Sequence, residues 1–122
     1  MKQKTLLYVE DNEDLRELVA GFLESEGFDV VAAASGKQAL ESLKSGFAPS
    51  LIMLDLSLPD MAAGDFSLAV KNLYFPAPCP PFIIASGKND IAEWAIKLGA
   101  VGKLRKPFNL DELQALLHQH LL

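Results

Sequence analysis

Short apolar runs alternate with longer segments of mixed polarity along this chain of 122 residues. Short runs of this kind, bounded by turn residues, are typical of strands that are buried on both faces of a sheet. We therefore predict five strands, at residues 5–9, 28–33, 51–54, 82–85 and 101–105.

The segments between these runs carry apolar residues three or four positions apart, which is the spacing of one buried helix face. The clearest cases are Leu15, Leu18, Val19, Phe22 and Leu23, then Phe66, Ala69, Val70 and Leu73, and finally Leu110, Leu113, Leu117 and Leu121. Capping and stop residues then predict five helices. The first covers residues 13–25 and is capped by Asp11 or Asn12, and the second runs from Ser35 to about Ser45. The third follows the loop 56–64 and ends before Pro76, the fourth runs from Asn89 or Asp90 to Gly99, and the fifth begins at Asn109.

Alternating strands and helices require right-handed crossovers and a mostly parallel sheet with helices on both faces. The prediction is an α/β fold with three layers: a flavodoxin-like, doubly wound (βα)5 chain whose parallel five-stranded sheet has the order 2-1-3-4-5. The proline-rich stretch 76–81 has the composition of a linker, but too little chain follows it for a second domain. We therefore assign residues 1–122 to a single domain.

Composition narrows the classes of function. The net charge of −5 argues against direct nucleic-acid binding by this domain. No apolar run approaches the roughly 20 residues of a membrane span, and the first residues lack the apolar region of a signal peptide. The single cysteine, Cys79, cannot form an internal disulfide. We therefore expect a cytoplasmic protein that does not bind membranes.

Charged and hydroxyl residues stand where the predicted strands end. Glu10 and Asp11 follow the first strand, Asp55 the third, Ser86 the fourth and Lys106 the fifth. The carboxyl ends of parallel strands share one edge of the sheet, and ligands bind there. We therefore expect these residues to form one small site. Crowded carboxylates repel each other, so the site predicts a hard cation such as Mg²⁺.

Over its whole length the chain resembles a response-regulator receiver domain, a phosphoprotein module of two-component phosphorelay signal transduction. The resemblance rests on the pair Glu10 and Asp11, on the sequence from Asp55 to Pro59 with Gly64 beyond it, on Ser86, and on the sequence from Lys106 to Phe108. Each part is weak alone, but together, in order and each at the end of its own strand, they are highly specific. The resemblance implies a signalling domain rather than a metabolic enzyme, with no output domain in this chain.

The resemblance also implies the chemistry. Asp55 would be the nucleophile that takes a phosphoryl group from a phosphohistidine on a sensor histidine kinase or phosphotransfer protein. Lys106 would bind one phosphoryl oxygen, and the hydroxyl of Ser86 another. Rearrangement of Ser86 would then switch a surface around the fourth helix, fifth strand and fifth helix, which binds a downstream protein that the sequence does not name.

Magnesium would complete such a site. The resemblance assigns Mg²⁺ to Asp11, Asp55 and the backbone carbonyl of Ser57, with Glu10 acting directly or through a water. An acidic pair of the form Glu-Asp is common in the family.

Two further features concern the fifth strand. Many receivers carry Tyr or Phe three residues before the lysine, as a switch that turns inward, and this chain has Lys103 there. An ammonium group is costly to bury in an apolar pocket, so the aromatic switch is in doubt. The family usually joins its lysine and proline by a cis peptide bond, which Lys106 and Pro107 permit.

Three other functions compete with this interpretation. A receiver-like scaffold without phosphorylation is left open by Lys103, although Asp55 and Lys106 argue against it. A flavin-binding electron carrier would need a hydroxyl-rich phosphate loop after the first strand, where residues 10–14 are mostly acidic. A phosphatase with an aspartate nucleophile usually places an acid two residues after it, where this chain has Ser57.

Overall fold

Strands and helices alternate along residues 4–121, the part of the chain that the computed structural model describes. The strands are β1 (Thr5–Val9), β2 (Asp29–Ala33), β3 (Leu51–Asp55), β4 (Phe82–Ser86) and β5 (Gly102–Arg105). The helices are α1 (Glu13–Ser25), α2 (Gly36–Lys44), α3 (Ala63–Tyr74), α4 (Ile91–Leu98) and α5 (Leu110–Leu121).

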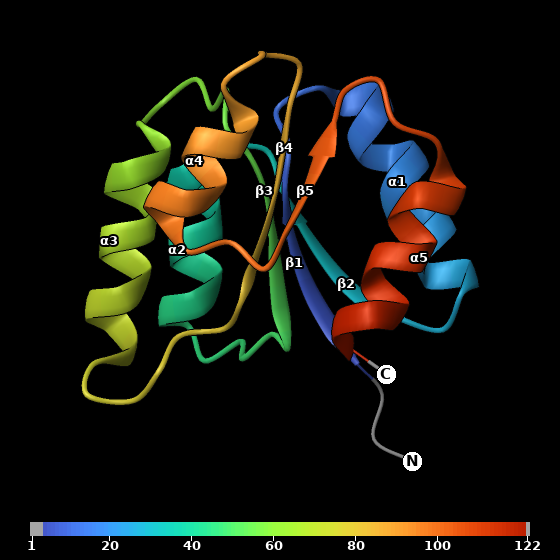
Figure 1. Cartoon of the computed structure of the whole chain (residues 1–122). Coiled ribbons are helices and arrows are strands. Elements are labelled where there is room, and N and C mark those ends of the chain that lie inside the picture. The colour runs from blue at the N-terminus through green and yellow to red at the C-terminus, as the bar shows by residue number, and fades with distance from the viewer. Residues whose placement is uncertain (1–3, 122) are drawn as a thin grey trace.

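The strands form one parallel sheet in the order β2-β1-β3-β4-β5, which confirms the predicted fold. Helices α1 and α5 cover one face of the sheet, and α2, α3 and α4 cover the other (Figure 1). Along the sheet Val9 pairs with Leu54, and Leu54 with Ile84, so the carboxyl ends of β1, β3 and β4 lie side by side. This edge is where the predicted site residues should meet.

Each face of the sheet has its own hydrophobic core. Strands β3 and β4 are buried along their whole length, and successive residues contribute to opposite faces. On the α2, α3 and α4 face, the ring of Phe66 meets that of Phe82 edge to face, with centroids 6.3 Å apart. The other core includes Tyr8, Val19 and the inward leucines of α5. Two buried faces hold the central strands, and therefore their ends, in fixed positions.

Capping residues mark the beginnings and ends of several helices, as predicted. The side-chain oxygens of Asn12, Ser35 and Asn109 accept hydrogen bonds of 2.9, 3.1 and 2.8 Å from backbone N–H groups three residues further on. Gly99 ends α4 with a φ of 65°, in the left-handed region that glycine occupies without strain. Asp90 stands at the N-cap position of α4, but its carboxylate accepts from the indole of Trp94 instead of the backbone.

Several predicted details differ from the structure. Strand β3 extends through Asp55 and β4 through Ser86, because the ladder continues beyond the apolar residues: the N–H of Leu56 still donates to the Ala85 carbonyl at 3.0 Å. Leu18 and Leu73, which we predicted to face the core, are 60% and 42% exposed. Helices α1 and α3 bury only the narrow stripe that touches the sheet, so residues at the margin of the apolar face lie in solvent.

Among the described residues, no helix is both long and apolar enough to cross a membrane. The proline-rich stretch connects α3 to β4, as predicted, and contains a cis bond between Phe75 and Pro76 that the sequence did not suggest.

Replacing Phe66 by alanine should destabilise the protein by about 3–5 kcal/mol, because it removes a fully buried ring from the core. Urea unfolding measures the change. Phe75→Ala is the matched control: its ring is 81% exposed, so the free energy of unfolding should change by less than about 0.5 kcal/mol. Equal effects of the two changes would contradict the assigned core.

Candidate acidic site at the sheet edge

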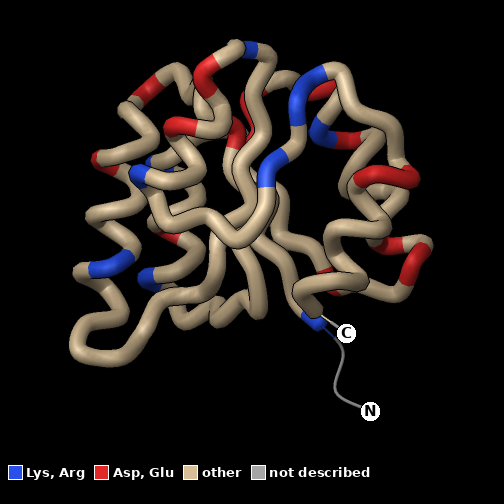
Figure 2. The backbone as a smooth tube through the Cα atoms, in the orientation of Figure 1, with Lys and Arg blue, Asp and Glu red and all other residues tan. Residues whose placement is uncertain are grey.

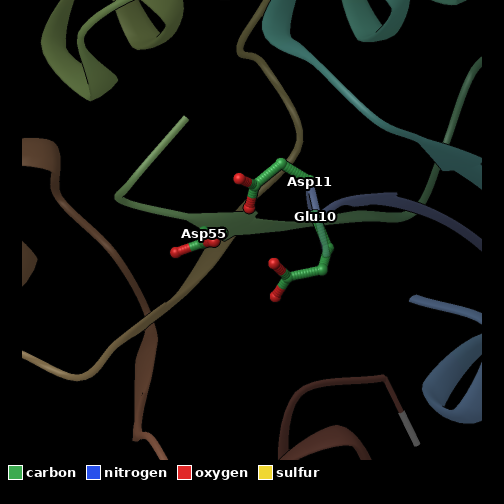
Figure 3. Close-up of side chains that lie close together, drawn as sticks. All are labelled: Glu10, Asp11 and Asp55. Carbon is green, nitrogen blue, oxygen red and sulfur yellow. The ribbon is translucent and has the colours of Figure 1, made fainter. Parts of the chain in front are cut away.

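Three carboxylates meet where β1 and β3 end. Oxygen atoms of Glu10, Asp11 and Asp55 all lie within 4.8 Å of one another. Figure 3 shows the three side chains converging from two neighbouring strand ends. Glu10 and Asp55 are buried, with 1% and 3% of their surface exposed, whereas Asp11 is open to solvent. The predicted convergence of these residues is therefore present in the structure.

The segment after β1 is held by its own backbone and by α1. The N–H of Glu10 donates to the carbonyl of Ala33 at 3.0 Å, which continues the ladder with β2. The Glu10 carboxylate accepts from the N–H of Asn12 at 3.2 Å, and the Glu10 carbonyl accepts from the Arg16 guanidinium at 3.0 Å. These bonds fix the turn that carries Asp11 from the strand into the helix.

Lys106 supplies the counter-charge from the end of β5. Its Nζ lies 2.6 Å from Oε1 of Glu10 and 3.2 Å from Oδ2 of Asp55. The Lys106 N–H donates to the Ser86 carbonyl at 2.9 Å, which continues the pairing of β4 and β5. The bond between Lys106 and Pro107 is cis, which confirms that prediction. Figure 2 shows this cationic segment beside acidic segments at the upper edge of the sheet.

Two serines flank the carboxylates. Ser86 is fully buried, and its Oγ accepts a hydrogen bond of 3.1 Å from the N–H of Lys88. Ser57 is exposed, and its N–H donates to Oδ1 of Asp55 at 3.1 Å. Ser86 follows Ala85, which pairs with Asp55 in the sheet, and Ser57 follows Asp55 along the chain. The hydroxyl of Ser86 is engaged with its own loop rather than with a carboxylate.

Burial and charge together set the electrostatics. Desolvation, with the neighbouring Asp55, raises the pKa of Glu10 to about 7, although its hydrogen bond to Lys106 acts in the opposite direction. Burial would lower the pKa of Lys106, but Glu10 and Asp55 outweigh it and the pKa is raised. Tyr8, buried beneath the site, has a raised pKa because of desolvation and the negative charge of Glu10. The site is thus an acidic cluster whose only cation within salt-bridge distance, among the described residues, is Lys106.

The donor set fits a hard divalent cation. Carboxylate oxygens from three residues can converge on one ion, and oxygen ligands are those that Mg²⁺ prefers. Two buried carboxylates with one ammonium between them leave net negative charge that a cation would neutralise.

Sequence reasoning missed two contacts around this site. Arg16 holds the turn after β1, and the carboxylate of Asp60 bonds to the start of α2. No pattern in the sequence links Asp60 to residues 24 positions away, and Arg16 looks like an ordinary solvated helix residue. Lys103 lies exposed on β5, in agreement with the expectation that it would not be buried.

Comparisons with known proteins agree with this geometry. The response regulator receiver domain family model matches residues 6–118. The transcriptional regulatory protein CrdR of Helicobacter pylori is 38% identical over 113 residues, which cover 93% of this chain and 53% of that protein. A putative NtrX-like response regulator of Rickettsia conorii is 39% identical over 121 residues, covering 96% of this chain and 25% of that protein. The chain therefore spans about half and a quarter of the length of these relatives.

Solved structures give the same result. The receiver domain of a putative LuxO repressor protein from Vibrio parahaemolyticus superposes with a TM-score of 0.81 at 32% sequence identity. The match covers 98% of this chain and 90% of that chain.

The raised pKa of Glu10 predicts a pH dependence of stability without metal. A carboxyl whose pKa is higher in the folded state holds its proton more tightly there, so its contribution favours folding below pH 4.5 and is lost as pH rises to about 7. The Glu10→Gln variant cannot lose this proton. Its free energy of unfolding should therefore rise relative to the unmodified protein between pH 4.5 and 7, measured by urea unfolding with chelator present. A constant difference over this range would contradict the assignment.

Proposed function

Because the chain belongs to the response regulator receiver domain family of two-component signalling, we propose that Asp55 accepts a phosphoryl group from a phosphohistidine of a sensor histidine kinase or phosphotransfer protein. The proposal is supported by the groups that surround this buried carboxylate. Two further carboxylates lie within 4.8 Å of it, and the Lys106 ammonium lies at 3.2 Å. A lone aspartate at the end of a strand would need none of these neighbours.

The transfer needs no base. An oxygen of the ionised Asp55 carboxylate forms a bond to phosphorus while the phosphorus–nitrogen bond of the phosphohistidine breaks, and the electron pair of that bond returns to the imidazole nitrogen. Phosphoryl transfer has a loose transition state with charge spread over the phosphoryl oxygens. The protein then contributes mainly position and neutralising charge.

Lys106 is the proposed ligand of a phosphoryl oxygen. Its Nζ already lies 3.2 Å from the attacking carboxylate, so an oxygen of the transferred group would come within its reach. An ammonium group binds such an oxygen as a compact point charge. Its second contact, to Glu10 at 2.6 Å, restrains the long side chain before the phosphoryl group arrives.

Asp11, Asp55 and the backbone carbonyl of Ser57 are the proposed ligands of Mg²⁺, with Glu10 acting directly or through a water. The bound ion would neutralise charge on the phosphoryl oxygens. The pKa of Glu10 near 7 means that its proton competes with the cation, so binding should strengthen as pH rises toward neutrality.

The output of phosphorylation is proposed to pass through Ser86. Its hydroxyl would leave the N–H of Lys88 and bond a phosphoryl oxygen, which would change the loop before α4. Arg105 on β5 bonds the side chain of Asn89 in the same loop, so the change reaches the surface formed by α4, β5 and α5. A downstream protein would bind there. We propose no direct nucleic-acid binding by this domain, whose chain carries a net charge of −5.

A receiver-like scaffold that is never phosphorylated is the second candidate. The observation in its favour is Lys103, exposed on β5 where many receivers carry an aromatic switch. Such a scaffold would bind its partner equally well with and without a phosphoryl donor.

Asp55→Asn should abolish phosphoryl acceptance, because the amide oxygen is a far weaker nucleophile than a carboxylate. Intact mass after incubation with acetyl phosphate should show one added phosphoryl group on the unmodified protein with Mg²⁺, and none with chelator or in the variant. Phosphate release is measured in the same tube, so that rapid hydrolysis is not mistaken for lack of transfer.

Asp65→Asn is the matched control, since it alters an exposed aspartate on α3 and should be phosphorylated as fully as the unmodified protein. Full labelling of Asp55→Asn would overturn the nucleophile assignment. If the unmodified protein shows neither an adduct nor phosphate release, the result would favour the scaffold.

Lys106→Ala should slow phosphorylation by about 100-fold, because a charge that stabilises the transition state is lost. Its affinity for Mg²⁺ should not fall, since the competing ammonium is gone. Rates of phosphate release from acetyl phosphate and calorimetric titration with MgCl₂ measure the two effects. Lys71→Ala, an exposed lysine of α3, should match the unmodified protein in both. A Lys106→Ala protein that binds Mg²⁺ and reacts at the full rate would contradict this role.

A further inference from the structure

The loop between β3 and α3 is hydrogen-bonded to the start of α2 through a single side chain. Oδ1 of Asp60 accepts from the N–H of Gly36 at 3.0 Å, and Oδ2 accepts from the N–H of Lys37 at 2.9 Å. In the described part of the chain, these are the only hydrogen bonds that join residues 58–61 to another segment. We call this pair of bonds the Asp60 tether.

The chemistry of the tether suits an ionised carboxylate. The first N–H groups of a helix have no partner within the helix and carry partial positive charge. Desolvation raises the pKa of Asp60, but the hydrogen bonds from Lys37 and Gly36 outweigh it, so the pKa lies below the ordinary value. The carboxylate is therefore charged at neutral pH and occupies both donors at once.

Close packing accompanies the hydrogen bonds. Gly36 is buried, and a Cβ built on it would lie 2.7 Å from Cγ of Met61, nearer than real Cβ contacts allow. Met61 also packs against the core on this face of the sheet. The loop thus rests directly on the first turn of α2, and a larger residue at position 36 would require the Met61 side chain to shift.

We infer that Asp60 is a positioning residue for the Mg²⁺ site: by attaching the loop to α2 it holds the Ser57 carbonyl in place as a ligand. The inference rests on the proposed function, because it concerns the same site. Ser57 lies between two fixed points, its own N–H bonded to Asp55 at 3.1 Å and the tether three residues later. Without the tether the loop keeps only its apolar packing, and the carbonyl is less well preorganised for the cation.

The test is calorimetric titration of the unphosphorylated protein with MgCl₂ at pH 7.5 and 0.15 M salt. Asp60→Ala should raise the dissociation constant about 10-fold, as loss of an outer-shell partner typically does. Asp60→Asn keeps one acceptor and should fall between this variant and the unmodified protein. Amide hydrogen exchange at residues 56–61 should become faster in Asp60→Ala even without metal.

Two controls separate positioning from helix stability and from charge. Ser35→Ala removes another cap from the same helix, the 3.1 Å bond to the N–H of Gln38, without touching the loop. It should lower the melting temperature by a few degrees, as we also expect for Asp60→Ala, and leave the dissociation constant within about twofold. Asp65→Asn removes one exposed carboxylate at the start of α3 and should likewise leave Mg²⁺ binding unchanged.

The outcomes are distinct. Unchanged affinity in Asp60→Ala, or an equal loss in Ser35→Ala or Asp65→Asn, would overturn the inference while leaving the proposed function intact. Failure of the unmodified protein to bind Mg²⁺ would overturn the proposed metal site, and the inference with it.

Discussion

The contact of one ammonium with two buried carboxylates is the interaction on which the arrangement of the site depends. Lys106 comes from the end of β5 and Glu10 from the end of β1, 96 residues apart, and Asp55 lies on β3 between these strands in the sheet. Burying charges costs free energy that their attraction repays only in part. Such a cluster contributes little to stability. Under the proposed function it would instead hold a metal cation and receive a phosphoryl group.

The fold tolerates this buried charge cluster because its stability comes from the apolar cores. Both faces of the sheet are covered, and β3 and β4 are buried along their length, so the apolar cores determine where the strands end. The chemistry is then confined to the residues just beyond those ends and to the loops that follow. Capping side chains and the Asp60 tether hold these loops against neighbouring helices.

The elements and the acidic site could be predicted from the sequence because both depend on local patterns. The bounds of β1 and α1 match the prediction, since an apolar run, a capping asparagine and a helical periodicity follow one another there. Parallel topology then implies that Glu10, Asp55 and Lys106 meet. The exposure of Leu18 and the contact of Asp60 with α2 depend on how helices and loops lie in space, which no local pattern records.

Phosphoryl acceptance at Asp55 can be tested by a crystal structure of the protein with Mg²⁺ and beryllofluoride, which mimics a phosphoryl group. We expect beryllium bonded to a carboxylate oxygen of Asp55, Mg²⁺ bound by Asp11, Asp55 and the Ser57 carbonyl, and fluorine atoms in contact with Lys106 and Ser86. Beryllofluoride bound elsewhere, or an Asp55 carboxylate that stays free while Lys106 keeps both of its present contacts, would contradict phosphoryl acceptance at Asp55.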